Sequence, residues 1–448
     1  MNRKRSPESD RPRTFRFLTF GCQMNKLDSE LAAAEMVRAG MAEAKTADEA
    51  DVILFNTCSV RQHAEDKVYS HLGALRARKM KDPDLLIGVI GCMAQKDGEK
   101  IFERMPHVDL VCGTRMFLKL PELIERVRES GEHVLAIAED QVVSYRRTAS
   151  RRPDRFRAFV SVMRGCDNWC AYCVVPALRG PEVSRPIADV VEEIRLLAED
   201  GCKEVTLLGQ NIDSYGKRLK PRATLAELVT EVNRVEGIER IRFVTSHPKD
   251  MSDEMLHAIA DLDKVCENIH LPAQSGSNRI LRAMKRGYTA ERYREIIAKA
   301  REWISEATIA SDFIVGFPGE TEEDFQDTVQ LVRDCRFQNS FIFKYSPRPG
   351  TAAAEMPDDV PMEVKRSRNW ELLKVQEEIS RELNRAMTGR NVEVLVEGPS
   401  KSAKTRLTGR TRRNHIVVFQ DPKDLVGTLR TIRITDATPL TLFGDLVE

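Results

Sequence analysis

The first third of the chain alternates short apolar runs with stretches of helical periodicity. The apolar runs occupy residues 15–20, 52–55, 85–90 and 108–111. Buried β-branched runs that alternate with helices are typical of a parallel, doubly wound sheet. We therefore predict a flavodoxin-like α/β domain with strand order 2-1-3-4, in which ligands bind beyond the carboxyl ends of the strands.

A second series of six apolar runs follows, and helices separate most of them. The runs occupy residues 159–163, 205–208, 241–245, 269–271, 309–315 and 341–345. Six βα units predict an open, partial (βα)6 TIM barrel rather than a closed barrel of eight strands. Its active face is expected at the carboxyl ends of these strands.

The pattern changes again after a long predicted helix over residues 364–387, which Gly389 ends. Short strands are predicted at residues 392–396, 406–409, 416–419 and 425–434, with Gly and Pro in the turns between them. This segment predicts a small all-β barrel, with the OB fold as one candidate. Its basic residues outnumber its acidic ones and are densest from Lys401 to Arg413, which favours binding to an RNA backbone over a merely solubilising surface.

Composition helps to set the domain boundaries and excludes membrane-spanning and secreted proteins. The chain has 448 residues with a formal net charge of +1, so any signal for nucleic acid is local rather than global. No apolar run reaches membrane-spanning length, and the polar start does not resemble a secretory signal, so we expect a cytoplasmic protein. The predicted organisation is a disordered basic tail (1–13), an α/β domain (14–142), a basic linker (143–157), the partial barrel (158–388) and the β barrel (389–448).

Cys166, Cys170 and Cys173 form a C-x3-C-x2-C loop after the first apolar run of the partial barrel. Three thiolates on one short loop can each hold one iron of a [4Fe–4S] cluster and leave the fourth iron without a protein ligand. That open iron could bind S-adenosylmethionine (SAM), and an electron from the cluster would then yield a carbon radical. The alternative is a zinc knuckle, but structural zinc sites usually have four ligands in C-x2-C pairs.

Four further cysteines share one place in the first domain. Cys22, Cys58, Cys92 and Cys112 each stand at the carboxyl end of a predicted strand. A single such cysteine is usually a small core residue, but the repeated position indicates a second [4Fe–4S] cluster. Cys22, Cys58 and Cys92 are expected to converge, whereas Cys112 is expected to be a core thiol at the edge of the sheet. Three ligands again leave one iron open, here for a sulfur species.

Several motifs resemble the methylthiotransferase family of radical-SAM enzymes, in order and spacing, from about Thr14 onward. They are Gly21-Cys22-Gln23-Met24-Asn25, Asn56-Thr57-Cys58-Ser59-Val60-Arg61, Gly91-Cys92, the loop of Cys166, Cys170 and Cys173 with Val174-Val175-Pro176, His270-Leu271-Pro272-Ala273-Gln274-Ser275-Gly276-Ser277 and Tyr345-Ser346-Pro347-Arg348-Pro349-Gly350-Thr351. The resemblance implies that Cys22, Cys58 and Cys92 bind an auxiliary cluster and that the last domain is an RNA-binding TRAM domain. It also suggests SAM contacts by Gly209, Gln210 and Asp312. The chain departs from the family at Asp312, where Gly is common, and at Gly319, where Glu is common.

The resemblance further implies a reaction and partners. In the tRNA-modifying branch, one SAM methylates a sulfur carried by the auxiliary cluster. A second SAM gives the 5′-deoxyadenosyl radical, and a methylthio group reaches C2 of the isopentenylated adenosine at tRNA position 37. The expected partners are a tRNA anticodon stem-loop and an electron donor such as flavodoxin or ferredoxin, with the protein a monomer.

Three alternatives remain at this stage. One branch of the family acts on an aspartate of a ribosomal protein and tends to have Pro-Lys-Asn after its first Cys, where this chain has Gln23-Met24-Asn25. Another acts on threonylcarbamoyl-adenosine. An RNA-binding protein with structural metal is the non-enzymatic alternative.

Overall fold

The computed structural model describes residues 13–59, 62–137, 152, 154–401, 405–420 and 424–447. The predicted tail, apart from Arg13, and most of the predicted linker lie outside these residues. The chain divides into two compact units. The first holds the N-terminal part of the chain together with Val174–Pro181, and the second holds Asp154–Cys173 and Glu182–Glu448.

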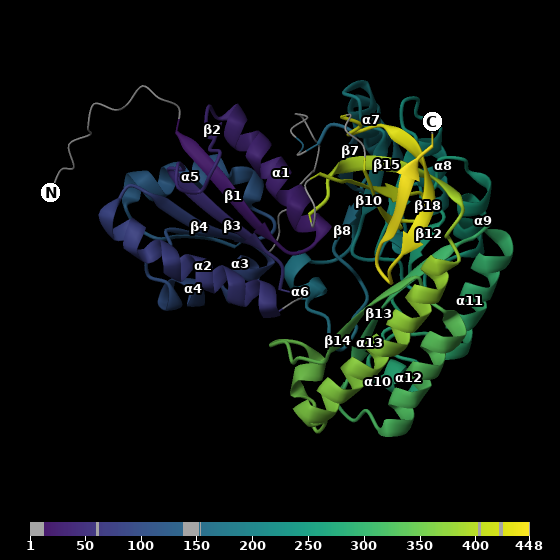
Figure 1. The fold of residues 1–448 in the computed structure, drawn as a ribbon. Coiled ribbons are helices and arrows are strands. Elements are labelled where there is room, and N and C mark those ends of the chain that lie inside the picture. The colour runs from purple at the N-terminus through teal and green to yellow at the C-terminus, as the bar shows by residue number, and fades with distance from the viewer. Residues whose placement is uncertain are drawn as a thin grey trace. The chain divides into compact units, whose positions relative to one another are not determined.

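The first unit is a parallel sheet with helices on both faces (Figure 1). The sheet order is β2-β1-β3-β4-β5-β6, and every adjacent pair is parallel. Its central strands are wholly buried, which explains their continuous apolar sequence. The elements are β1 (Thr14–Phe20), α1 (Gln23–Arg38), β2 (Ala42–Glu43), β3 (Val52–Thr57), α2 (Gln62–Lys81), β4 (Leu86–Gly91), α3 (Cys92–Asp97), α4 (Lys100–Arg104), β5 (Leu110–Cys112), η1 (Phe117–Lys119), α5 (Leu120–Ser130), β6 (Val134–Ala136) and α6 (Val175–Arg179).

The flavodoxin-like class is confirmed, but the assignment of strands to its order was wrong. The four predicted strands correspond to β1, β3, β4 and β5, which lie in chain order. The two-residue strand β2, which no apolar run marks, takes the outer position beside β1. Counting β2 gives the order 2-1-3-4.

The second unit contains the predicted partial TIM barrel. Two parallel three-stranded sheets, β7-β10-β11 and β12-β13-β14, are joined by a bridge between Ile241 and Val265. The six-strand prediction is confirmed, and a short hairpin of β8 and β9 was missed. The elements are β7 (Arg157–Ser161), β8 (Met163–Arg164), β9 (Val183–Ser184), α7 (Ile187–Glu199), β10 (Glu204–Leu208), η2 (Ile212–Ser214), α8 (Leu225–Asn233), β11 (Arg240–Phe243), α9 (Asp253–Asp261), β12 (Asn268–His270), α10 (Asn278–Ala283), α11 (Ala290–Trp303), β13 (Thr308–Val315), α12 (Glu322–Cys335), β14 (Asn339–Lys344), η3 (Ala352–Glu355) and α13 (Met362–Arg385).

Hydroxyl side chains begin several of the barrel helices. Thr224 starts α8 and Thr321 starts α12, each in a reciprocal capping box with an acidic residue three positions later. Ser252 and Thr289 cap α9 and α11 in the simpler way. These caps satisfy backbone N–H groups that the helix leaves unpaired, so the βα turns hold fixed positions at the strand ends.

The second unit ends in a closed barrel of five strands in the order β15-β16-β17-β19-β18. All pairs are antiparallel except β17 with β19, so the predicted small β barrel is confirmed, with one strand more than expected. The strands are β15 (Asn391–Pro399), β16 (Leu407–Thr411), β17 (Ile416–Phe419), β18 (Leu429–Ala437) and β19 (Leu442–Leu446).

The turn between β16 and β17 packs on the amino ends of the partial barrel's strands. Arg242 donates hydrogen bonds to the carbonyls of Thr411 and Arg412, at 2.7 and 2.9 Å. Thr308 at the start of β13 donates to the carbonyl of Arg413 at 2.9 Å. The β barrel therefore covers the end of the TIM barrel away from the carboxyl ends of its strands.

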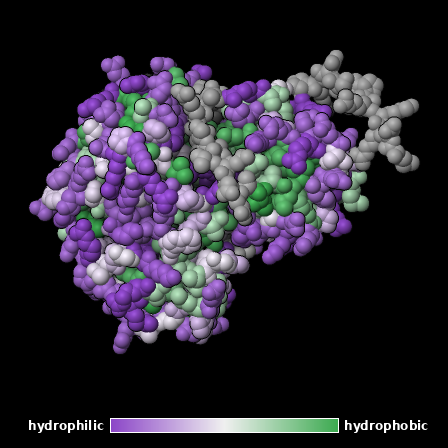
Figure 2. All heavy atoms as spheres, turned by 180° about the vertical axis from the view of Figure 1, so that it is seen from behind, coloured by the Kyte–Doolittle hydropathy of each residue, from purple (hydrophilic) through white to green (hydrophobic). Residues whose placement is uncertain are grey.

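Polar side chains cover most of the larger unit's visible face, and hydrophobic ones occupy small separate areas (Figure 2). No helix among the described residues is long and apolar enough to cross a membrane.

Candidate functional site

Cys22, Cys58 and Cys92 follow three neighbouring strands of the first unit. Phe20, Thr57 and Gly91 lie on one rung of the sheet, and each of the three cysteines comes one or two residues later. Gly91 has a φ of 87°, and a Cβ there would lie 2.3 Å from the Asn56 side chain. This turn therefore needs glycine, and the predicted convergence of the three cysteines is supported by their shared rung.

The three thiols act on one another. Hydrogen bonding with Cys58 lowers the pKa of Cys22 to about 6 and that of Cys92 to about 7, and the same contacts raise the pKa of Cys58 well above its usual value. Cys58 and Cys92 are buried. Thiols of lowered pKa are thiolates near neutral pH, which is the form that binds metal.

Charged and polar groups surround these thiols. Arg179 on α6 forms a buried ion pair with Asp28 at 2.8 Å, and its charge also lowers the pKa of Cys22 and Cys92. The Cys22 thiol donates to the Asn25 side chain at 3.1 Å. Ser59, next to Cys58, is buried, and its Oγ has no hydrogen-bond partner among the residues that the structure describes. Sequence reasoning missed both Arg179 and Asp28, because nothing in the pattern assigns α6 to the first unit.

These residues fit an iron–sulfur cluster. The set consists of three thiols on rigid strand ends, two of them acidic, with an arginine nearby and an unsatisfied hydroxyl. Among the described residues, no three Cys, His, Asp or Glu side chains lie close enough together to bind one metal ion. A cluster does not need that arrangement, since each thiolate binds a different iron.

Cys166, Cys170 and Cys173 lie on the loop after β8 in the second unit, and backbone hydrogen bonds hold this loop on the TIM barrel. Ala171 donates to the carbonyl of Met284 at 3.0 Å and accepts from the backbone N–H of Ala353 at 2.8 Å. The loop residues also pack with Phe317 and Tyr345, beyond the ends of β13 and β14. The structure thus places this loop at the carboxyl ends of the strands, as predicted for an active face.

The cysteine loop has a buried cation that sequence reasoning missed. Arg286 donates a hydrogen bond to the Cys170 sulfur at 3.4 Å, and its side chain is almost wholly inside the protein. The Cys166 sulfur accepts a bond from the backbone N–H of Asn168, also at 3.4 Å. Arg286 lies more than a hundred residues from the loop, and no sequence spacing links the two.

The three residues suggested as SAM contacts have different surroundings. Gln210 accepts a hydrogen bond from the backbone N–H of Gly165 at 2.6 Å, so it holds the start of the cysteine loop. A Cβ at Gly209 would lie 2.7 Å from the Met163 side chain, so glycine is needed there for packing. Asp312 lies 3.2 Å from His270. The structure brings Gly209 and Gln210 to the loop and pairs Asp312 with a histidine.

The remaining cysteines are buried away from these loops. Cys112 is the last residue of β5, which lies between β4 and β6 and not at the edge of the sheet as expected, and burial raises the pKa of its thiol. Burial also raises the pKa of Cys335 to about 11 and that of Cys266. Cys202 is buried as well. None of these four cysteines lies on the two loops, and a buried cysteine usually acts as a small hydrophobic residue, which agrees with structural roles.

Much of the basic charge expected to face RNA is paired within the protein. Arg412 binds Glu267 at 2.7 Å, Arg390 binds Glu306 at 2.5 Å, Arg413 also binds Glu306, and Arg410 binds Glu397 at 3.3 Å. Arg157, assigned above to the linker, begins β7 and forms ion pairs with Asp154 and Glu397. Five basic residues of this region have no acidic partner among the described residues: Arg385, Lys401, Arg406, Arg430 and Arg433.

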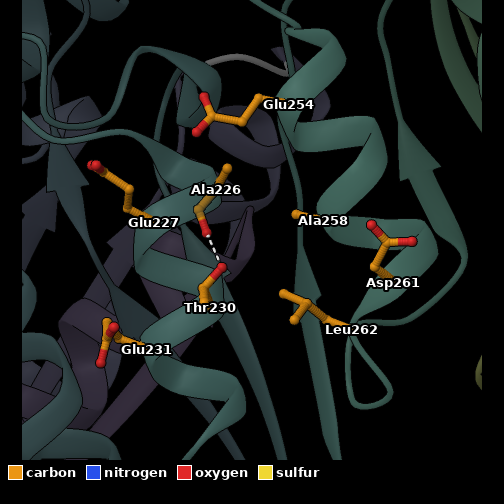
Figure 3. A pocket seen from close by; sticks show the side chains of 8 residues that line it. All are labelled: Ala226, Glu227, Thr230, Glu231, Glu254, Ala258, Asp261 and Leu262. Carbon is orange, nitrogen blue, oxygen red and sulfur yellow. Dashed lines mark hydrogen bonds between the residues drawn. The ribbon is translucent and has the colours of Figure 1, made fainter.

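A groove of about 330 Å³ lies between α8 and α9. Its polar lining is mostly acidic, with Glu227, Glu231, Glu254 and Asp261 around it (Figure 3). None of the predicted site residues lines it, so we do not associate it with the cysteine loops.

Three family models match the chain. The first, "Uncharacterized protein family UPF0004", covers residues 14–113, the Radical SAM superfamily covers 160–332 and the TRAM domain covers 385–447. Solved structures of similar fold include the radical SAM methyltransferase TsrM of Kitasatospora setae, with a TM-score of 0.55, 14% identity and 77% of each chain covered. The radical enzyme OxsB matches with a TM-score of 0.54 at 15% identity, over 82% of this chain and 56% of the other.

Curated relatives match over nearly their full length. The tRNA-2-methylthio-N6-dimethylallyladenosine synthase of Acetivibrio thermocellus is 46% identical over 100% of this chain and 94% of its own. Those of Carboxydothermus hydrogenoformans and Syntrophomonas wolfei are 46% and 47% identical, over 97% of this chain and 99% and 98% of theirs. With cysteines after three adjacent strands, a C-x3-C-x2-C loop and a terminal five-stranded barrel, the chain belongs to this radical-SAM family of tRNA-2-methylthio-N6-dimethylallyladenosine synthases.

Proposed function

We propose that this protein transfers a methylthio group to C2 of N6-dimethylallyladenosine at position 37 of tRNA. The observation that carries the proposal is the presence of two separate cysteine trios, one in each compact unit. The chain is also 46% identical to a tRNA-2-methylthio-N6-dimethylallyladenosine synthase. A single trio would suffice for SAM cleavage, so the second trio needs its own function. Sulfur delivery is the function that accounts for it.

Cys166, Cys170 and Cys173 would hold one [4Fe–4S] cluster, and Cys22, Cys58 and Cys92 would hold a second. When bound, the two clusters supply the electron that cleaves SAM and the sulfur that is transferred. The acidic thiols of Cys22 and Cys92 and the cation of Arg179 support the second assignment. Cys112 is left out because it is buried in a strand.

Gln210 and Gly209 would keep the cysteine loop in its binding conformation. The 2.6 Å hydrogen bond from Gly165 to Gln210 fixes the residue just before Cys166. The absence of a side chain at Gly209 lets its backbone approach that segment closely. Asp312, half-buried on β13, would offer a carboxylate to a bound SAM molecule, with His270 as its neighbour.

The terminal barrel would bind the anticodon stem-loop through basic residues that are not already paired. Arg406 and Arg433 are exposed and have no acidic partner among the residues described, so their charge is available to phosphate groups. A small one-electron carrier such as flavodoxin or ferredoxin would supply the reducing electrons.

The test is mass spectrometry of tRNA nucleosides from cells that lack this protein. The proposal expects the 2-methylthio derivative to disappear and N6-dimethylallyladenosine to accumulate, and the gene on a plasmid to reverse both changes. An unchanged level of 2-methylthio-N6-dimethylallyladenosine, with loss of a methylthio mark on threonylcarbamoyl-adenosine or on a ribosomal protein, would assign the chain to another substrate.

A further inference from the structure

We propose that Arg286 is a positioning residue that raises the reduction potential of the SAM-binding cluster through the sulfur of Cys170. This inference rests on the proposed function only in taking Cys170 as a cluster ligand. It concerns how easily that cluster accepts an electron, and not which substrate is modified.

The guanidinium of Arg286 is fixed on all sides. Its Nη1 donates to the Cys170 sulfur at 3.4 Å, its Nη2 donates to the carbonyl of Pro272 at 3.0 Å and its Nε donates to the Tyr288 hydroxyl at 3.1 Å. The Tyr288 hydroxyl in turn donates to the carbonyl of Ala273 at 2.6 Å. Because the guanidinium is planar with donors in a fixed fork, these bonds leave it no freedom to turn away from Cys170.

The charge of Arg286 needs a counter-charge that the protein does not otherwise provide. Its side chain is only 5% exposed. Among the described residues no carboxylate lies within ion-pair distance of it, and its other two partners are neutral. A buried cation without an anion is unfavourable. The thiolate of Cys170, as part of an anionic cluster, is the group placed to neutralise it.

This arrangement distinguishes Cys170 from Cys166. The Cys166 sulfur accepts a hydrogen bond from a neutral backbone N–H, whereas Cys170 accepts one from a full cation. Reduction adds one electron to the cluster and breaks no bond at Arg286. A nearby positive charge stabilises the more negative, reduced form, and hydrogen bonds to ligand sulfurs set the potentials of such clusters. Arg286 therefore makes reduction easier.

The test is a redox titration of the reconstituted full-length protein with dithionite as the one-electron reductant. Electron paramagnetic resonance follows the reduced signal that changes on SAM addition. Arg286→Met is expected to lower the ratio of reduced to oxidised cluster about tenfold at a fixed potential, a shift of about 59 mV for a one-electron couple. Arg286→Lys keeps the charge and should shift the potential by less than half as much. Arg282→Met, an exposed neighbour on α10, should not shift it.

An unchanged potential in an iron-replete Arg286→Met protein would overturn the inference. If that variant loses iron, Arg286→Lys decides. It must take up iron like the parent and shift the potential by less than half of about 59 mV. A Lys variant as deficient in iron as the Met variant would assign Arg286 to packing alone. The titration contains no tRNA, so it does not depend on the substrate. If Arg286→Met alters the potential but cells with the parent protein contain no methylthiolated tRNA, only the proposed function is overturned.

Discussion

The residues around the first cysteine trio show how a buried ion pair supports a site. Asp28 and Arg179 lie 2.8 Å apart with side chains 2% and 4% exposed. One partner comes from α1 and the other from α6, so the pair joins segments about 150 residues apart. Removing one member of such a pair leaves a buried charge without compensation.

We predict that Asp28→Asn lowers the opening free energy of α1 by about 3 kcal/mol, because Arg179 then lacks its carboxylate. Hydrogen exchange of the α1 amides in the metal-free protein measures this. Glu35→Gln on the same helix is the matched control. Its pair with Arg38 is much more exposed, so it should cost less than about 1 kcal/mol. Equal effects of the two changes would contradict the importance of burial here.

A buried histidine makes the terminal barrel sensitive to acid. Burial lowers the pKa of His415 from 6.5 to about 4, and its Nδ1 lies 3.2 Å from the Thr411 hydroxyl. The unfolded chain therefore takes up a proton at higher pH than the folded one. The contribution to stability is complete above about pH 6.5 and is lost as the pH falls toward about 4.

The expected loss across that window is up to about 3 kcal/mol. Hydrogen exchange of β16 and β17, measured at several pH values, should show it in the parent protein and not in His415→Gln. The control is His257→Gln, since His257 is exposed and stacks on Trp303. An acid response that persists in His415→Gln would place its origin elsewhere.

At the scale of elements, apolar runs predicted most strands because these are buried on both faces. β3 and β4 have no exposed residue, and their sequences are continuously apolar apart from the last positions. The strands that escaped prediction lack such runs. β2 has two residues, β6 has three, and β19 includes Gly444 and Asp445. Their pairing depends on neighbouring strands that local sequence does not specify.

The candidate site divides in the same way. The six cysteines that were predicted stand at strand ends or in a tight motif, and both of these are local signals. Arg286, Arg179 and Asp28 act through contacts between distant segments, and only the folded chain brings them to the thiols. For the basic residues of the terminal barrel, the sequence assigned too many to RNA binding. It cannot show which arginines are already paired with carboxylates of the protein.

The turn between β16 and β17 is an example, because it packs on the strands of the partial barrel within the larger unit. Arg242 is 9% exposed and binds Glu204 at 2.9 Å besides the two carbonyls of the turn. We predict that Arg242→Met lowers the free energy of opening this turn by about 3 kcal/mol or more, because Glu204 stays buried without its nearest partner. Limited proteolysis between β16 and β17 should become faster.

Lys203→Met is the matched control for that change. Lys203 lies beside Glu204, and its pair with Glu239 at 3.3 Å is about one-third exposed. Such a pair contributes less than about 1 kcal/mol, so cleavage of the turn should stay at the parent's rate. If Lys203→Met accelerates cleavage as much as Arg242→Met, the turn is not held by the buried arginine.

At the scale of the whole molecule, two cysteine trios in two units imply separable chemistry. We predict that Cys22→Ala leaves SAM cleavage on reduction intact but abolishes methylthiolation, because the trio in the second unit is untouched. The iron content of the reconstituted protein should fall from about eight to about four per chain. Cys166→Ala is the complementary control and should abolish SAM cleavage. Loss of SAM cleavage in a folded Cys22→Ala protein would contradict this division.

The basic residues of the terminal barrel include paired and unpaired ones, and the salt dependence of tRNA binding tests which of them contact phosphate. Arg406 and Arg433 are exposed without an acidic partner among the described residues, whereas Arg390 is paired with Glu306. Each phosphate contact releases counterions, so Arg406→Gln and Arg433→Gln should each reduce the slope of log affinity for tRNA against log salt by about 0.7 to 0.9. Arg390→Gln should change it less, because Glu306 already neutralises that charge. Equal slopes for all three variants would mean that net charge attracts the tRNA and that the pairing pattern within the protein does not select the contacts.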